Sequence, residues 1–157
     1  MSAPRVRSTG VATLIAVGPG DLELMPVRAM RALTRAQIVI ADAARLAPVA
    51  EVVAAVDADG LPLERAARAK AVSQAFKSGL SVVRLFSGDP VLDGAFARES
   101  AALVKANVPF DFVPGVSVIT GTAAYAGVGL TDHDSNEVRV VDAASDHTDW
   151  REHIADH

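Results

Sequence analysis

The fold is decided by the stretch Val83-Arg84-Leu85-Phe86-Ser87-Gly88-Asp89-Pro90, in which an apolar strand runs directly into a Gly/Pro turn. The same kind of junction occurs at Val17-Gly18-Pro19-Gly20 and at Val113-Pro114-Gly115-Val116-Ser117. Glycine and proline turns allow a ligand to approach backbone amides and carbonyls closely. Because open α/β sheets bind ligands at the carboxyl ends of their strands, three such ends predict one small-molecule site, provided that the strands are parallel.

Apolar and amphipathic segments alternate along the chain. Short apolar runs predict buried strands at residues 11–17, 37–41, 81–86 and 110–113. Apolar residues at spacings of three and four predict helices that begin near Leu24 and Leu46, and further helices at residues 64–77, 94–106 and 117–126. This alternation is typical of right-handed βαβ crossovers, so the expected fold class is α/β, a mainly parallel open sheet with helices on both faces.

The composition changes after Thr131. Residues 132–137 are acidic and polar, a further strand is predicted at residues 138–141, and the chain ends within a helical pattern. We therefore expect a disordered segment at residues 1–10, a domain at residues 11–131, and a linker with the truncated start of a second domain at residues 132–157.

Bulk composition excludes several classes of function. The 157 residues carry a net charge of −4, with a pI near 5.5, so no overall field attracts nucleic acid or an anionic membrane. Cysteine is absent, and the four histidines lie in the final quarter without a metal-ligand pattern, so no metal site is expected. No apolar run reaches the roughly 20 residues that span a bilayer, and no signal peptide is recognised, so we expect a cytoplasmic protein.

Carboxylates follow two of the predicted strands. Asp89 could hold ribose hydroxyls or could cap the following helix. Asp42, directly after a buried strand, could act as a general base or equally as a helix cap. The Gly18-Pro19-Gly20 turn has neither the GxGxxG nor the GK[ST] spacing, so the sequence supports neither a Rossmann cofactor nor a P-loop. The backbone of this turn could contact an adenine or a ribose, or the segment could equally be a plain strand-to-helix turn.

Four ordered motifs resemble the amino-terminal half of the tetrapyrrole methylases, the S-adenosylmethionine-dependent family that contains uroporphyrinogen-III C-methyltransferase. They are VGPGD at 17–21 with IVIAD at 38–42, VVRLFSGDP at 82–90, VPFDFVPGVS at 108–117 and AYAGVGLT at 124–131. The resemblance covers about residues 11–131. The segment that follows is most similar to the divergent actinobacterial type, in which the methylase half precedes a uroporphyrinogen-III synthase.

The resemblance implies a two-domain α/β enzyme, usually a homodimer, with this chain as the amino-terminal domain of the tetrapyrrole methylase fold. It also implies that the cofactor lies in a cleft between the two domains, so we expect this chain to be inactive by itself. It implies S-adenosyl-L-methionine as cofactor and C-methylation of a uroporphyrinogen-III-type tetrapyrrole, in the sirohaem and cobalamin branch, as the reaction. Asp42 falls where the family has its candidate proton acceptor. The residues that the resemblance assigns to the cofactor are Pro19, Ser87, Gly88, Asp89, Leu92, Ser117 and Val118.

The chain also departs from the family pattern. No lysine matches the family's proton donor between the second and third predicted strands, and the family's Phe-Gly-Arg-Gly segment reads Leu92-Asp93-Gly94-Ala95. The loss of family arginines, with acidic Asp93 and Asp132 in those segments, is expected to weaken binding of a carboxylate-rich substrate. Two alternatives therefore remain: a non-catalytic scaffold that partners a uroporphyrinogen-III synthase, and a methylase of another precorrin.

Overall fold

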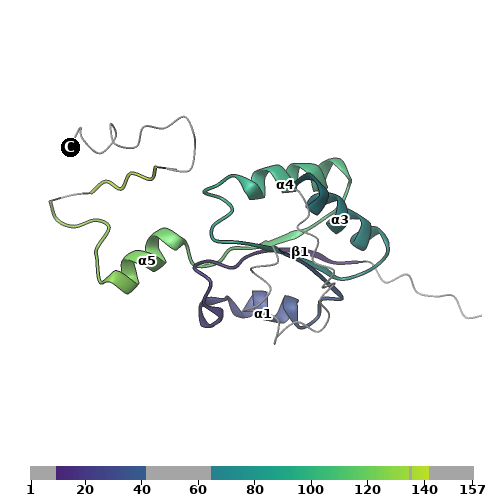
Figure 1. The fold of residues 1–157 in the computed structure, drawn as a ribbon, viewed down its shortest axis with the longest axis horizontal. Helices are drawn as coiled ribbons and strands as arrows, with labels where there is room; N and C mark the ends of the chain where they lie inside the picture. Colours follow the sequence, from purple (N-terminus) through teal and green to yellow (C-terminus); the bar gives the residue numbers. More distant parts are fainter. Residues whose placement is uncertain (1–9, 42–64, 135, 142–157) are drawn as a thin grey trace, which may run out of the picture. The chain divides into compact units, whose positions relative to one another are not determined.

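The computed structural model describes residues 10–41, 65–134 and 136–141 (Figure 1). Contacts divide the chain into two units, Met1–Gly121 and Thr122–His157, and each is described by itself. Four predictions lie outside the described residues: disorder at residues 1–9, the helix near Leu46, the role of Asp42, and the helical pattern at the end of the chain.

The first unit contains a four-stranded sheet in which every pair of neighbouring strands is parallel. The spatial order is β2-β3-β1-β4. The strands are β1 (Ala12–Ala16), β2 (Ile38–Ile40), β3 (Val82–Phe86) and β4 (Asp111–Val113). The prediction of a mainly parallel open sheet is confirmed, and the four strands predicted at residues 11–17, 37–41, 81–86 and 110–113 are found within those ranges.

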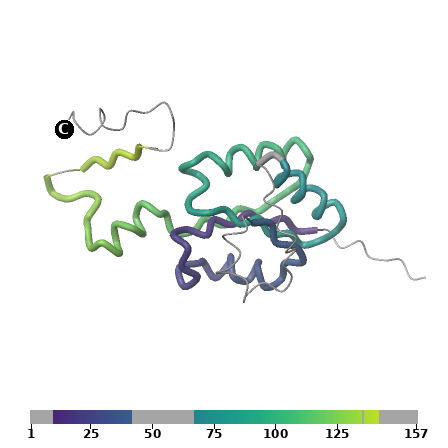
Figure 2. Tube along the Cα trace, in the orientation of Figure 1, coloured from purple at the N-terminus to yellow at the C-terminus, as the bar shows by residue number. Residues whose placement is uncertain are grey.

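Helices cover both faces of this sheet, as predicted. Helix α1 (Val27–Leu33) lies against one face, and helices α3 (Arg65–Lys77) and α4 (Ala95–Lys105) lie against the other (Figure 1). The Cα trace shows the chain passing from β1 to the α1 side, whereas α3 and α4 follow on the opposite side (Figure 2). Consecutive strand residues point to opposite faces, so the strands need apolar residues at nearly every position.

The two faces form two separate apolar clusters. Ile15 and Leu85 pack with Leu33 of α1, whereas Leu14 and Phe86 pack on the face covered by α3 and α4. All five of these side chains are at most 2% exposed. Burial of this kind stabilises the first unit by about 1.5–3 kcal/mol for each large apolar side chain, so the sheet is a rigid base for the loops at its edges.

The helix predicted to begin near Leu24 begins later, because of Pro26. Residues Leu22–Leu24 form a short 3-10 turn, η1, and α1 starts only after Pro26. Proline disfavours the helical region for the residue before it, and Met25 is accordingly extended, with φ −74° and ψ 135°. Asp21 caps η1, since its Oδ1 accepts from the Glu23 backbone N at 2.9 Å.

Helix α5 (Val118–Ala126) ends as predicted, but the strand predicted at residues 138–141 is wrong. Gly127 adopts a φ of +67° and terminates the helix, and the Val128 backbone N donates to the Ala123 carbonyl at 2.9 Å. Residues 138–141 pair with no strand among the described residues. An apolar run without a pairing partner does not form a stable strand in water.

Candidate functional site

Three strand-to-helix turns meet at the carboxyl edge of the sheet. The Gly18 backbone N donates to the Gly88 carbonyl at 3.2 Å, which joins the turns after β1 and β3. The turn after β4 packs directly against the end of β1, because a Cβ on Gly115 would lie only 2.4 Å from the Ala16 carbonyl oxygen. The structure therefore brings together the three strand ends that the sequence places at one edge.

This convergence depends on the absence of side chains at Gly18 and Gly115. Gly18 has a φ of +73°, and a Cβ on it would lie 2.7 Å from the Val116 carbonyl oxygen, closer than real Cβ atoms approach. A Cβ on Gly115 would also lie 3.1 Å from the Gly18 backbone N. Because backbone packs directly on backbone, the three turns form one continuous rim.

Three of the residues assigned to the cofactor are brought together at this rim. The ideal Cβ position of Gly121 lies 3.6 Å from Cγ of Pro19, so the start of α5 packs on the Pro19 turn. The ideal Cβ position of Gly88 lies 3.8 Å from Cγ1 of Val118. Pro19, Gly88 and Val118 thus surround the contact between the turns with small or apolar groups.

The other assigned residues extend the same loops. The Ser117 carbonyl accepts from the Gly121 N at 2.8 Å and so opens α5, and Ser87 is half-buried at the end of β3. The alternative role of Asp89 as a helix cap is wrong, because the N-cap of α4 is Gly94; the Asp89 Oδ1 instead accepts from the Val91 N at 3.1 Å within the turn that precedes α4. Its Oδ2 has no hydrogen-bond partner within the described part of the chain. Leu92 lies further along that loop and is 48% exposed.

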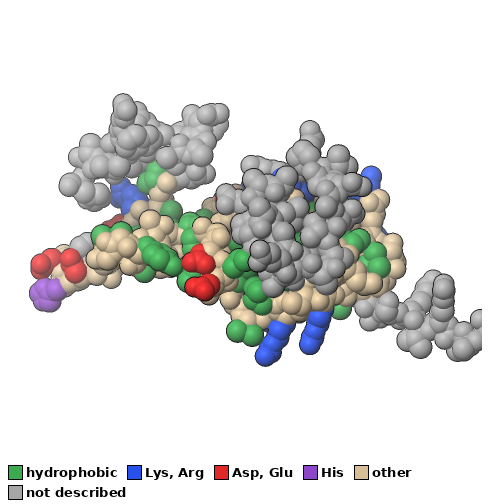
Figure 3. All heavy atoms as spheres, turned by 60° about the horizontal axis from the view of Figure 1, so that its bottom comes forward, with side chains coloured by type: hydrophobic (Ala, Val, Ile, Leu, Met, Phe, Trp, Pro, Cys, Tyr) green, Lys and Arg blue, Asp and Glu red, His purple; other side chains and the backbone are tan. Residues whose placement is uncertain are grey.

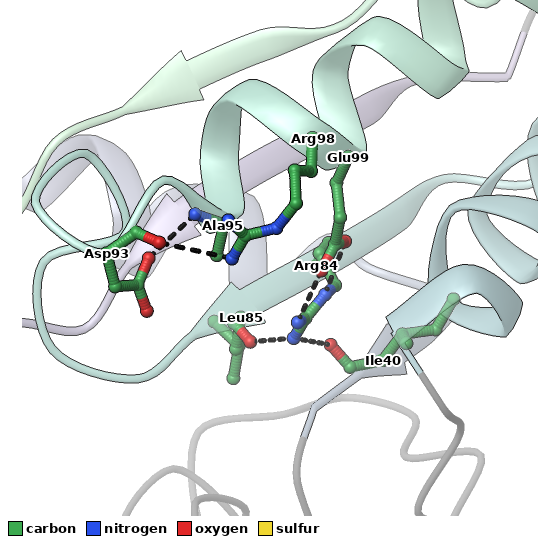
Figure 4. A network of polar contacts seen from close by, with 7 residues as sticks. All are labelled: Ile40, Arg84, Leu85, Asp93, Ala95, Arg98 and Glu99. Carbon is green, nitrogen blue, oxygen red and sulfur yellow. Dashed lines mark hydrogen bonds and ion pairs between the residues drawn. The ribbon is translucent and has the colours of Figure 1, made fainter. Parts of the chain in front are cut away.

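Sequence reasoning missed a buried ion pair next to this rim. Arg84 of β3 and Glu99 of α4 have side chains only 2% and 7% exposed, and Nε–Oε2 and Nη2–Oε1 are both 2.9 Å (Figure 4). Nη1 donates to the carbonyls of Leu85 and Ile40, and the guanidinium carbon lies 4.4 Å from the centre of the Phe86 ring. An arginine inside an apolar strand was the available signal, because a buried charge requires a partner.

This ion pair ties three elements together near the rim. Arg84 contacts the last residue of β2, Ile40, as well as α4, so it holds the end of β2 against β3. The bidentate geometry satisfies both carboxylate oxygens of Glu99, as a desolvated carboxylate requires. The rim is therefore supported by a polar contact as well as by apolar packing.

A cavity of about 720 Å³ adjoins the ion pair. It lies between α3, α4 and the carboxyl end of β3, and Ser87 belongs both to it and to the rim. Its lining residues are Arg68, Ala69, Arg84, Phe86, Ser87, Asp93, Ala95, Arg98, Glu99 and Ala102. A second hollow, of about 300 Å³, lies at the opposite edge of the sheet, and its lining includes Arg28 and Arg31 of α1 and Arg35, which follows that helix.

The donors at the rim suit an organic ligand. Among the described residues, no group of three His, Cys, Asp or Glu side chains is placed to hold a metal ion. The rim offers backbone groups, the Ser87 hydroxyl and one free carboxylate oxygen of Asp89, beside the apolar Pro19 and Val118. This combination fits a nucleoside, whose base needs an apolar surface and whose ribose needs hydrogen-bond acceptors.

The described helices and one face of the described surface bear on membrane and nucleic-acid binding. No described helix combines the length and the apolar character needed to cross a bilayer. Figure 3 shows basic, acidic and hydrophobic side chains interspersed over the described atoms of the face that it draws. On that face, the described residues form no basic area of the kind that binds nucleic acid.

Known proteins share this sequence and fold. Residues 12–156 match the family model of tetrapyrrole (corrin/porphyrin) methylases. Siroheme synthase 1 of Klebsiella pneumoniae subsp. pneumoniae is 38% identical over 137 residues, which cover 82% of this chain and 29% of that protein. The chain spans about a third of the length of the curated relatives that it matches.

Two solved structures from Thermus thermophilus are similar as well. Uroporphyrin-III C-methyltransferase superposes with a TM-score of 0.69 at 29% identity, over 79% of this chain and 55% of that one. A structure of uroporphyrin-III C-methyltransferase in complex with S-adenosyl homocysteine superposes with a TM-score of 0.63 at 28% identity, over 79% of this chain and 51% of that one.

Proposed function

Since this chain belongs to the tetrapyrrole (corrin/porphyrin) methylase family, we propose that it forms the cofactor-binding part of an S-adenosyl-L-methionine-dependent C-methyltransferase. The substrate in this proposal is a uroporphyrinogen-III-type tetrapyrrole. The observation that carries it is the convergence of the turns after β1, β3 and β4, joined by the Gly18–Gly88 hydrogen bond. The similar enzyme in complex with S-adenosyl homocysteine supports the cofactor.

Each residue at the rim has a role in this proposal. Pro19 and Val118 provide an apolar surface for the adenine, and the flanking glycines keep the backbone accessible. The free Oδ2 of Asp89 accepts a hydrogen bond from the ribose, while its Oδ1 keeps the turn rigid through Val91. Ser87 lies between the cofactor and the adjoining cavity.

The reaction depends mainly on positioning. The bound cofactor supplies an electrophilic methyl group on its sulfonium. The residues of the rim and the cavity hold the acceptor carbon in line with that methyl group, which removes most of the entropic cost of a bimolecular reaction. In this proposal Asp42, two residues beyond the end of β2, accepts the proton that leaves the pyrrole ring.

The family resemblance also underlies three finer proposals. We propose that the full-length protein is a homodimer, that it is cytoplasmic, and that its partners are small molecules rather than nucleic acids or membranes. The weak overall charge of −4 supports the last of these.

Methyl transfer by the full-length protein tests the proposed function. With S-adenosylmethionine and uroporphyrinogen III, mass spectrometry is expected to detect products that have gained whole methyl groups. Asp42→Asn is expected to lower kcat by about 10²–10⁴-fold, the usual contribution of a general base, with little change in KM for the cofactor. Glu23→Gln, which removes the charge of an exposed carboxylate with no role in this proposal, is the matched control.

One result would contradict the proposed function, and another would contradict only the role of Asp42. A folded full-length protein that methylates neither uroporphyrinogen III nor any precorrin supports the scaffold alternative. Undiminished turnover by Asp42→Asn removes the proposed proton acceptor and leaves the methyltransferase assignment in place.

A further inference from the structure

The hollow of about 300 Å³ at α1 lies at the edge of the sheet opposite the rim, and the proposed function does not use it. The amino ends of three neighbouring strands contribute Val11, Thr13, Ser81, Val83 and Asp111 to its lining. In the sheet, Thr13 is in register with Val83 on one side and with Asp111 on the other. These side chains point to one face of the sheet, the face that α1 covers, so we call this space the α1 hollow.

The charges around the α1 hollow do not cancel. Its described lining contains three arginines and one carboxylate. Arg28 pairs with Asp111, with Nη2 and Oδ2 2.9 Å apart. The side chains of Arg31 and Arg35 make no ion pair and no hydrogen bond with any described residue. The described lining therefore has an excess of two positive charges, and both lie on guanidinium groups that are available to a ligand.

The floor of the α1 hollow adds a hydroxyl and an apolar surface. Thr13 is only 8% exposed, and its hydroxyl has no hydrogen-bond partner among the described residues. Since no completely buried side-chain oxygen in the described part of the chain lacks a partner, this hydroxyl reaches the open space of the hollow. Ala32, Ala36 and Val83 line the same space with apolar groups. A ligand that accepts a hydrogen bond would supply the partner that a mostly buried hydroxyl normally has.

The size and the lining of the α1 hollow select one class of ligand. Guanidinium groups bind phosphate and carboxylate oxygens in bidentate geometry, and two of them match a doubly charged group. A volume of about 300 Å³ is at the lower limit of small-ligand sites and leaves room for an organic body beside such a group. The simplest alternative is that Arg31 and Arg35 are solvated cations near the carboxyl end of α1, where the helix dipole favours positive charge. That alternative accounts for the charges but not for the hollow or for the unpartnered Thr13 hydroxyl.

We infer that the α1 hollow binds a small organic dianion. Its phosphate group, or its pair of carboxylates, contacts Arg31 and Arg35 and accepts a hydrogen bond from Thr13, while its apolar body lies against Ala32 and Ala36. This inference goes beyond the proposed function, because the α1 hollow shares no described lining residue with the rim or with the cavity of about 720 Å³.

Calorimetric titration of the full-length protein at slightly alkaline pH tests this inference. Phenyl phosphate and phthalate both combine two negative charges with an aromatic ring, and they distinguish a phosphate site from a dicarboxylate site. Inorganic phosphate lacks the apolar body, and benzyl alcohol lacks the charge. We expect one of the two organic dianions to bind with a Kd below about 1 mM, and at least about fivefold more tightly than inorganic phosphate or benzyl alcohol.

Variants locate the site. Arg31→Gln and Arg35→Gln are each expected to weaken binding of that dianion about tenfold, the usual loss for one charge-assisted hydrogen bond. Thr13→Val keeps the shape of the side chain and removes the hydroxyl, so it is expected to weaken binding about threefold. Lys105→Gln is the control, because it removes an exposed cation from α4 on the other face of the sheet and is expected to change nothing. Saturating S-adenosylhomocysteine is also expected to leave the affinity unchanged.

Three outcomes would overturn this inference, and each leaves the proposed function in place. If neither organic dianion binds more tightly than inorganic phosphate, Arg31 and Arg35 are solvated cations. If Lys105→Gln weakens binding as much as Arg31→Gln does, the anion responds to the overall charge of the protein and not to this hollow. If S-adenosylhomocysteine displaces the dianion while Arg31→Gln, Arg35→Gln and Thr13→Val bind it like the parent protein, the dianion occupies the cofactor site.

Discussion

Arg84 shows how a single residue constrains the architecture around the site. It is an arginine in the middle of an apolar strand, and its guanidinium is saturated by one carboxylate, two carbonyls and an aromatic ring. Such pairs contribute little net stability relative to apolar residues of similar size, but breaking one leaves a desolvated charge. The pair therefore acts as a specific link between β2, β3 and α4.

Arg84→Met is expected to destabilise the protein by about 3–5 kcal/mol, because Glu99 is left buried without its partner. The double variant Arg84→Met/Glu99→Leu is expected to recover most of this loss. Urea unfolding followed by circular dichroism measures both. The matched control is Arg28→Met, which removes an exposed pair with Asp111 and is expected to cost at most about 1 kcal/mol. A single variant as stable as the double variant would contradict this account.

At the scale of elements, the site depends on how closely the turns approach β1. Gly115→Ala is expected to cost about 1–3 kcal/mol, because the new Cβ overlaps the Ala16 carbonyl and the turn after β4 must move away. The same movement is expected to abolish S-adenosylhomocysteine binding by the full-length protein in calorimetry. Gly129→Ala is the matched control, since its Cβ would meet only the Thr131 carbonyl at 3.4 Å. If Gly115→Ala binds S-adenosylhomocysteine like the parent protein, the three turns do not form the cofactor site.

Local chemistry determined which elements the sequence predicted correctly. Apolar runs between glycine signals predicted the four strands because a parallel strand is buried on both faces. The later start of α1 could have been predicted from the sequence as well, since Pro26 stands at its N-cap. The strand at residues 138–141 was predicted wrongly, because a local pattern carries no information about a pairing partner.

The site was predictable to a similar extent. The convergence of the turns followed from parallel strands, whereas the Arg84–Glu99 pair depends on how the loop between β3 and α4 folds. No spacing rule relates a strand residue to a helix residue 15 positions later. The cavity beside that pair could not be predicted from the sequence for the same reason.

At the scale of the whole molecule, binding and chemistry are distributed over different parts of the first unit. The rim of three turns carries the proposed cofactor residues, and the cavity of about 720 Å³ adjoins it at Ser87. The hollow at the opposite edge of the sheet, with Arg31 and Arg35, is separate from both. The account therefore assigns both ligands to the carboxyl edge of one parallel sheet, where their reacting atoms can meet.

A crystal structure of the full-length protein grown with S-adenosylhomocysteine tests this central claim most directly. The account predicts adenosine density against Pro19 and Val118, with a ribose hydroxyl within hydrogen-bond distance of Asp89 Oδ2. Adenosine density at the amino edge of the sheet beside Arg31 and Arg35, or none at a concentration that saturates a known methyltransferase of this family, would contradict it.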